Sequence, residues 1–114
     1  MLAIPHLDNA ILATLRDVMG DDYDLLIETY INDSNNRLRS LAEGIANRDG
    51  DLLRRTAHSF KGSSSNIGAL RLAEYCSVME SLALANDPLS WPGQLVAIET
   101  EFAQVAQLLQ PPPV

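Results

Sequence analysis

The sequence predicts an all-α fold, an antiparallel four-helix bundle with an additional short N-terminal helix. Three observations lead to this prediction. Apolar residues recur at helical spacing in five successive segments. Hydrophobic residues make up 46% of the chain but aromatic residues only 5%, which is typical of a bundle built on Leu, Ile and Ala. No segment has the alternation and the β-branched density of a strand.

The first two helices are expected in the N-terminal half of the chain. The first opens after Asp8, a good N-cap residue, with Leu7 and Leu12 at the two positions of a hydrophobic staple. Gly20 supplies its C-terminal stop. The second helix begins at the acidic pair 21–22 and continues to about residue 47, so it must span the bundle from end to end.

Three further helices follow in the C-terminal half. Asp49 is the expected N-cap of the third helix, and Gly68 either ends that helix or opens the next loop. The fourth helix is expected at about 69–85. Ser90 is expected to cap the fifth helix, whose first turn tolerates Pro92.

Length and composition limit what the chain can be. We expect one domain over residues 1–114 with a frayed tail at about 110–114. A net charge of −7 argues against nucleic acid or anionic membrane as a partner. The single cysteine, Cys76, excludes an internal disulfide and is interpreted as a small core residue. No apolar run reaches the roughly 18 residues of a membrane span, and the single cysteine fits a reducing cytoplasm, so we expect a cytoplasmic protein. We also expect a monomer. His6, which has no partner of catalytic type nearby in the sequence, is expected at the surface.

One stretch of the third helix carries residues of a different kind. On a helix, His58, Lys61, Gly62 and Ser65 share one face, and a second face forms the buried stripe of Leu53, Ala57, Phe60 and Ser64. His58 therefore points away from the core, with Lys61 one turn along. A glycine in an exposed helix costs about 1 kcal/mol relative to alanine. Because Gly62 has no side chain, the surface of another protein could approach the ring of His58.

This stretch resembles the signature of histidine-containing phosphotransfer (HPt) domains. The resemblance rests on Ala57-His58-x-x-Lys61-Gly62, three small residues and then Gly68, and it covers essentially the whole chain. It implies a helical bundle that works in a phosphorelay. In the family, a histidine takes a phosphoryl group from the aspartate of one receiver domain and passes it to the aspartate of another. The stand-alone bacterial type is the expected form, because the chain begins at Met1 and ends soon after the last helix; a domain excised from a hybrid kinase is the alternative.

The resemblance also implies roles for single residues. His58 would be the phosphorylated residue, Lys61 would neutralise phosphoryl charge, and Gly62 would make room for the receiver. Glu80 sits where many family members have a Gln or Glu that helps to orient the histidine.

Partner docking is expected on the same side of the third helix. Arg54 and Arg55 lie one turn before His58 and, with Lys61, would form a basic patch that steers the carboxylate-rich surface of a receiver. Ser65 is a further docking candidate on this face. The expected partners are receiver domains of hybrid sensor kinases and response regulators. The chain has no phosphate-binding glycine loop and too little length for an ATP site, which indicates a phosphocarrier, not a kinase, without a cofactor of its own. Mg²⁺ is expected on the receiver.

Two other functions remain open at this point. A helical adaptor or dimerisation module, in which His58 is incidental, predicts that His58→Gln leaves partner function intact. A hydrolase or metal site using His58 is disfavoured, because the chain has only 2 histidines and no carboxylate–histidine spacing that resembles a ligand set.

Overall fold

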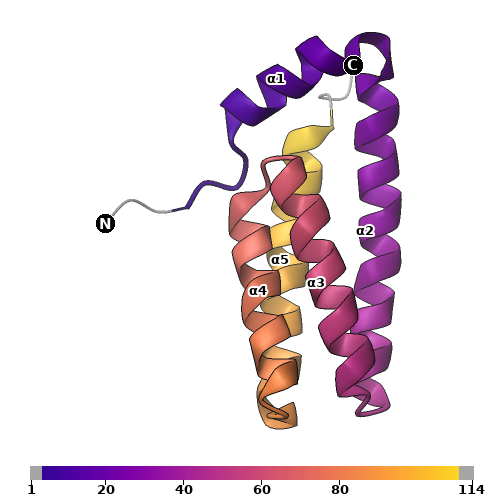
Figure 1. Cartoon of the computed structure of the whole chain (residues 1–114), viewed down its shortest axis with the longest axis vertical. Coiled ribbons are helices and arrows are strands. Elements are labelled where there is room, and N and C mark those ends of the chain that lie inside the picture. Colours follow the sequence, from indigo (N-terminus) through magenta and orange to yellow (C-terminus); the bar gives the residue numbers. More distant parts are fainter. Residues whose placement is uncertain (1–3, 111–114) are drawn as a thin grey trace.

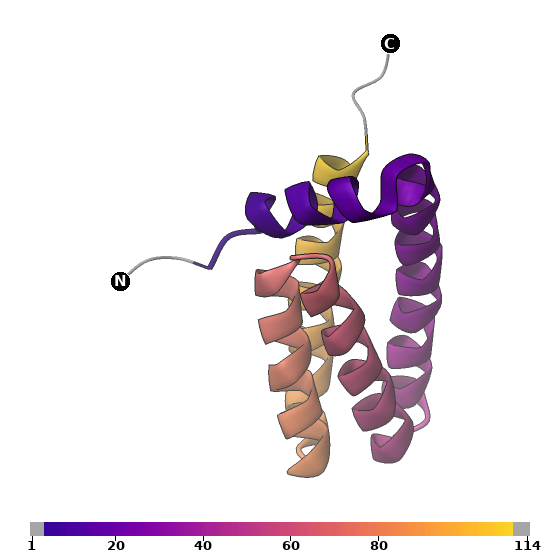
Figure 2. The ribbon, with the colours of Figure 1, turned by 45° about the horizontal axis from the view of Figure 1, so that its top comes forward.

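Five α-helices and two short 3₁₀ turns form the fold in a computed structural model, which describes residues 4–110. In chain order these elements are α1 (Asn9–Met19), η1 (Gly20–Asp22), α2 (Tyr23–Ala46), α3 (Gly50–Asn66), α4 (Leu70–Leu84), η2 (Pro88–Ser90) and α5 (Trp91–Leu109). Helices α2 to α5 form an antiparallel bundle, and α1 lies across one end of it (Figures 1 and 2). The predicted four-helix bundle with an additional N-terminal helix is therefore confirmed. The expected frayed tail at about 110–114 lies, apart from Gln110, outside the described residues.

Two of the predicted N-caps hold their helices as the sequence indicates. The Asp8 carboxylate accepts hydrogen bonds from two backbone amides in the first turn of α1. Asp49 accepts a hydrogen bond from the Leu52 amide at 3.0 Å. Gly20 follows α1 with φ of +53°, a left-handed conformation that ends the helix. Each of these signals is local, which is why the sequence locates the ends of α1 and the start of α3 so closely.

The predicted cap of the fifth helix is wrong. Ser90 makes no hydrogen bond to the first turn of α5; its hydroxyl donates to the Asp87 carbonyl at 2.6 Å. The cause is that η2 runs directly into α5, so Ser90 already has helical backbone angles (φ −85°, ψ −16°). An N-cap side chain reaches the free amides from an extended backbone, and Ser90 does not have one. Pro92 does lie in the first turn, as predicted.

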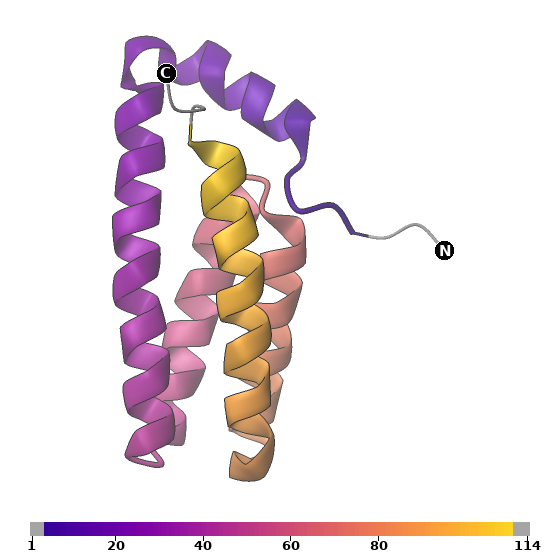
Figure 3. The same ribbon diagram turned by 180° about the vertical axis from the view of Figure 1, so that it is seen from behind.

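The core runs along the length of the bundle between α2, α3, α4 and α5, with α5 and α2 side by side when the molecule is seen from behind (Figure 3). Cys76 is fully buried there, and burial raises the pKa of its thiol to about 12, which agrees with its interpretation as a core residue. Two buried hydroxyls also meet in this core, because the Tyr30 hydroxyl from α2 lies 2.8 Å from Ser64 Oγ on α3. None of the described helices is both long and apolar enough to cross a membrane.

Residues 4–8 are tied to three parts of the bundle, and this corrects the prediction for His6. The His6 ring lies 2.6 Å from a carboxylate oxygen of Glu101 on α5, a residue only 4% exposed. The Arg71 guanidinium of α4 donates to the Ile4 carbonyl at 2.7 Å, and the Asp8 amide donates to the Gly68 carbonyl at 2.8 Å. His6 is therefore half-buried with a carboxylate partner. The partner lies 95 residues away in the chain, beyond the reach of any local sequence pattern.

Replacing His6 by alanine is expected to destabilise the bundle by about 1–3 kcal/mol, because the buried Glu101 carboxylate loses the partner shown in the structure. Urea unfolding of both proteins measures the difference. Glu101→Gln in the His6→Ala background should recover most of the loss, because a neutral amide is easier to bury than an unpaired carboxylate. Equal unfolding free energies for wild type and His6→Ala would contradict a stabilising role of this pair.

Candidate functional site

His58 occupies the middle of α3 and faces away from the core. Its side chain is 65% exposed. The opposite stripe of α3 is fully buried, at 0% exposure, and consists of Leu53, Ala57, Phe60 and Ser64. Phe60 anchors this stripe by an edge-on contact with Phe102 of α5, at 6.2 Å between ring centroids. The packing of one side of α3 thus fixes the other side, with His58, towards solvent, as the helical periodicity predicts.

Glu80 brings two of the predicted site residues together. It projects from α4, which runs antiparallel to α3, and its two carboxylate oxygens take different partners. Oε2 lies 2.8 Å from Nδ1 of His58, and Oε1 accepts a hydrogen bond from Nζ of Lys61 at 2.7 Å. The Glu80 side chain is only 17% exposed, so this contact is held between the two helices. The structure therefore places Glu80 directly against the histidine that the sequence singles out.

The protonation of this group follows from its hydrogen bonds. The Lys61 ammonium, more than any other group, holds the pKa of Glu80 below its ordinary value of 4.5, and the bond to His58 acts in the same direction. Glu80 is therefore ionised at neutral pH and can only accept hydrogen bonds. Nδ1 of His58 must then donate in this contact, and in the neutral form of the ring Nε2 has a free lone pair. The ring presents a free nucleophilic nitrogen on the exposed side of α3.

Replacing Lys61 by methionine is expected to raise the pKa of Glu80 towards its ordinary value, because the main cause of its lowering is removed. A carbon-detected NMR titration of the glutamate carboxyls measures this shift directly. Arg55→Met is the matched control, since Arg55 pairs with Asp51 and leaves Glu80 untouched. An unchanged Glu80 titration in Lys61→Met would contradict the ion pair. The Lys61–Glu80 pair should stabilise the fold at pH values above the unfolded-state pKa of Glu80. This contribution should be lost as the pH falls through the folded-state pKa of Glu80.

Gly62 lies beside His58 at a position where the fold does not require glycine. A Cβ built on Gly62 would meet no atom within 4 Å, and its backbone is ordinary helix. The contrast within the chain is Gly68, whose φ is +83° and whose Cβ would lie 3.2 Å from the Asp8 carbonyl oxygen. The folded chain would gain about 1 kcal/mol from alanine at 62. Gly62 therefore keeps an open space on the His58 face at some expense of helix stability.

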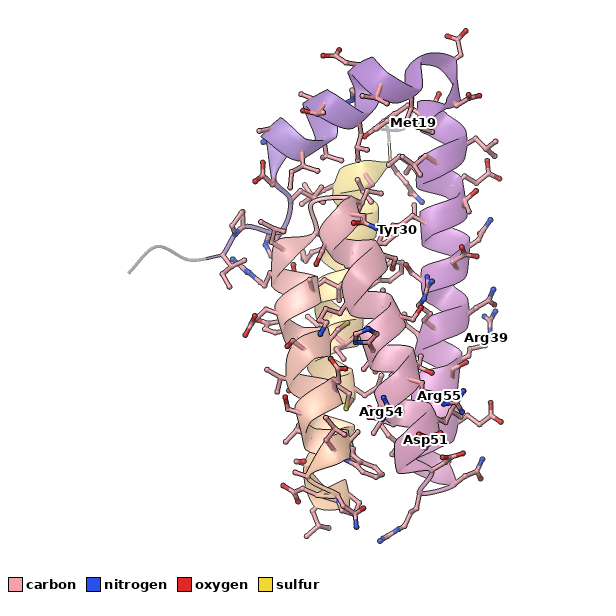
Figure 4. All side chains as sticks on the ribbon, viewed as in Figure 1. Met19, Tyr30, Arg39, Asp51, Arg54 and Arg55 are labelled. Carbon is pink, nitrogen blue, oxygen red and sulfur yellow. The ribbon has the colours of Figure 1, made fainter. Side chains whose placement is uncertain are left out.

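The basic patch predicted around His58 is largely neutralised within the chain itself. Arg54 and Arg55 share the Asp51 carboxylate, at 3.0 Å and 2.9 Å, near the start of α3 (Figure 4). Hydrogen bonds from these arginines, that of Arg54 first, hold the pKa of Asp51 below its ordinary value. Lys61 is paired with Glu80 as described above. The three cations are thus in place but each has an acidic partner, which lowers the net charge of the patch.

One basic residue near the site was not predicted as part of it. Arg37 reaches from α2 to α3, where its Nε donates to Ser59 Oγ at 3.2 Å, next to His58 in the chain. Arg37 and Arg55 line opposite sides of a polar groove between the two helices, together with Asn36, Ser40, Thr56 and Ser59. The sequence holds no signal that links residue 37 to residue 59. Ser65 is exposed on the His58 face, as predicted.

Comparisons with known proteins agree with this site. The Hpt domain family matches residues 25–108. The chain is also similar to the crystal structure of histidine-containing phosphotransfer protein B (HptB) from Pseudomonas aeruginosa PAO1. Sequence identity is 45%, the match covers 94% of this chain and 93% of that one, and the TM-score is 0.90. A comparison with curated proteins finds no match. The chain belongs to the Hpt domain family and is a histidine phosphotransfer protein of a phosphorelay, in which such domains interact with the receiver domains of two-component systems.

Proposed function

We propose that this chain carries a phosphoryl group between the aspartates of two receiver domains through a phosphohistidine at His58. The observation that carries the proposal is an exposed imidazole whose Nδ1 is engaged by Glu80 at 2.8 Å, which leaves Nε2 free on the open side of α3. No other histidine among the described residues is comparable. His6 is half-buried and pairs with the buried Glu101.

The chemistry that this ring supports is an in-line displacement. The Nε2 lone pair attacks the phosphorus of a receiver aspartyl phosphate, the bond between phosphorus and the carboxyl oxygen breaks, and the aspartate leaves as a carboxylate. The return step reverses these events towards a second receiver. Each step needs placement and charge neutralisation more than covalent chemistry by the protein. The chain acts as a phosphocarrier without kinase activity of its own.

Three neighbours of His58 have separate roles in this proposal. Glu80 orients the imidazole through Nδ1. Lys61 lies one helical turn away and is one third exposed, so its ammonium can turn from Glu80 to a phosphoryl oxygen. Gly62 leaves room for the receiver to bring its aspartate against the ring. The docking area extends to Arg54, Arg55 and Ser65, with Arg37 added from α2.

The partners follow from the same surface. Receiver domains of hybrid sensor kinases and response regulators would supply the aspartates and hold the Mg²⁺ that the transfer requires, so this chain needs no cofactor. The net charge of the chain is −7, which favours neither nucleic acid nor an anionic membrane as a partner. We place this activity in the cytoplasm, in a monomer whose 114 residues form a single domain.

The test is phosphoryl uptake by the purified chain from a phosphorylated receiver domain. The expected product is labelled on histidine, labile in acid and stable in base. Failure of several receivers to label a protein that is folded and helical would favour the adaptor function in its place.

A further inference from the structure

A groove between α2 and α5 lies on the side of the bundle away from His58. His58 and Glu80 meet across α3 and α4, which lie in front of α5 in Figure 1. Helices α2 and α5 face the viewer when the molecule is seen from behind (Figure 3). Of the four pairs of neighbouring helices in the bundle, α2 and α5 pack least closely. A partner held between them would leave the phosphotransfer site open.

The groove is lined in part by aliphatic side chains. Ile27 is 7% exposed, and Ile31 and Leu109 are only partly buried, so they still offer apolar surface to a partner. The remaining lining residues are Asp24, Glu28, Asn32 and Gln110. Leu25 and Leu108, which adjoin the lining residues in the chain, are 62% and 56% exposed. The volume of about 450 Å³ lies within the range of about 300–1,000 Å³ that is typical of binding pockets.

The charge around this groove is negative. Residues 21–36 include five acidic residues and no Lys or Arg. These are Asp21, Asp22, Asp24, Glu28 and Asp33, and within residues 4–110 none of them forms an ion pair. Asp24 and Glu28, which line the groove, are both exposed. Since α5 also holds no basic residue, the two helices leave this negative charge without a counterpart.

The basic residues that flank this stretch in the sequence are engaged elsewhere. The guanidinium of Arg16 lies over the ring of Tyr23, 5.1 Å from its centroid. Arg37 donates to Ser59 on α3. The His58 face differs, because each cation of the basic patch predicted there already has an acidic partner. A partner of the groove would therefore have to bring positive charge of its own.

We propose that the groove between α2 and α5 binds a basic amphipathic helix of another protein. The aliphatic side chains of that helix would enter the groove, and its Lys or Arg residues would face Asp24 and Glu28. A groove between two helices suits a third helix, because rows of side chains on one helix fit between the rows of its neighbours. Opposite charges at the rim would steer the encounter and fix the orientation of the partner, and the buried aliphatic contacts would supply most of the affinity.

Two other occupants match the charge of the groove less well. A second copy of the chain would bring its own net charge of −7 towards an acidic rim. The residues that follow Gln110 in the sequence, Pro-Pro-Pro-Val, include no basic residue. A basic helix is the occupant that answers both the apolar lining and the unpaired carboxylates.

The test uses a model helix of Leu and Lys, about 14 residues long, with leucines at i, i+3, i+4 and i+7. A second peptide has Glu in place of every Lys. Each is titrated into the ¹⁵N-labelled chain, and the shifts of the backbone amides are recorded. The Lys peptide should shift residues 24–32 and 108–110 most, and the Glu peptide should not bind. Shifts spread evenly over the chain, or centred on the His58 face, would overturn the inference.

Reversal of the rim charges separates this groove from a general effect of net charge. Asp24→Lys/Glu28→Lys should bind the Lys peptide about tenfold more weakly and should gain binding of the Glu peptide. Asp33→Lys/Glu99→Lys is the matched control, because it changes the net charge equally at exposed positions of the same two helices outside the groove lining. This control should keep its affinity for the Lys peptide within about twofold at physiological salt. Equal losses in the two variants would contradict a specific site.

Further measurements place the bound helix and test the other occupants. Transfer from a receiver to the chain saturated with the Lys peptide should proceed at the rate of the free chain, and inhibition would overturn the inference. A dimer that Asp24→Lys/Glu28→Lys dissociates would make a second copy the occupant, and Overhauser contacts from residues 111–114 to Ile31 would make the tail the occupant. Either result would refute the proposed partner. The shift map does not require phosphorylation, so it stands even if the proposed function fails.

Discussion

Replacing His58 by glutamine is expected to abolish phosphoryl uptake from a receiver and to leave the bundle folded. Glutamine has no nitrogen lone pair that can attack phosphorus, so the loss should be complete within the detection limit. The fold should tolerate the change because the side chain is 65% exposed and its hydrogen bond with Glu80 lies at the edge of the helix interface. The stability cost of losing this contact, whose histidine side is exposed, is expected to stay below about 1 kcal/mol. Labelling with a phosphorylated receiver, beside urea unfolding, measures both quantities.

The second histidine of the chain provides the control for this experiment. His6→Gln makes the same substitution at a residue whose partner, Glu101, lies on α5, and glutamine can still donate a hydrogen bond to that carboxylate. We expect this variant to be labelled as wild type is. Label that remains on His58→Gln would contradict the assignment of the phosphorylated residue, and loss of label from His6→Gln would show that the assay responds to more than His58.

Replacing Gly62 by tryptophan is expected to slow transfer from a receiver by about 100-fold or more, since a displacement of only about 1 Å between reacting groups has an effect of that size. The indole would occupy the open space beside His58 and hold the receiver away from the ring. The fold should be retained, because a side chain at this position leads into solvent and its Cβ meets nothing within 4 Å. Stopped-flow or quench measurements give the rate of transfer, and circular dichroism of the same sample shows whether the fold is retained.

Gly93 allows a matched control for Gly62. It lies in the first turn of α5, and a Cβ there also meets nothing within 4 Å. Gly93→Trp adds the same surface bulk away from His58 and should transfer at the wild-type rate. Labelling by phosphoramidate should remain normal in Gly62→Trp, because a small donor needs no docking surface. Fast transfer from a receiver to Gly62→Trp would refute the steric role of the glycine.

Much of this arrangement can be predicted from the sequence because its determinants are local. The caps Asp8 and Asp49 and the periodicity around His58 act within one or two helical turns, and they locate the helix ends and the exposed face of α3. The contact between His58 and Glu80 bridges 22 residues. The resemblance to a family indicates that contact, but no pattern of spacing in this chain does.

The features that the sequence does not predict are those that depend on how the helices meet. Lys61 could be placed beside His58, but its pairing with Glu80 depends on the register between α3 and α4. Arg37 approaches the site only because α2 packs against α3. Ser90 fails as a cap because a 3₁₀ turn joins its helix without a break. Such outcomes are decided by tertiary packing, which overrides local preference.

The contacts of residues 4–8 with the bundle affect how this domain can be shortened or fused to other proteins. The match to the Hpt family begins at residue 25, which would be a natural place to cut. A fragment starting there would lack His6 and the hydrogen bond from the Asp8 amide to the Gly68 carbonyl. It would leave Glu101 buried without its histidine partner. The physical unit of folding therefore starts earlier than the segment shared across the family. Transplants into other signalling proteins should carry residues 4–24 with them.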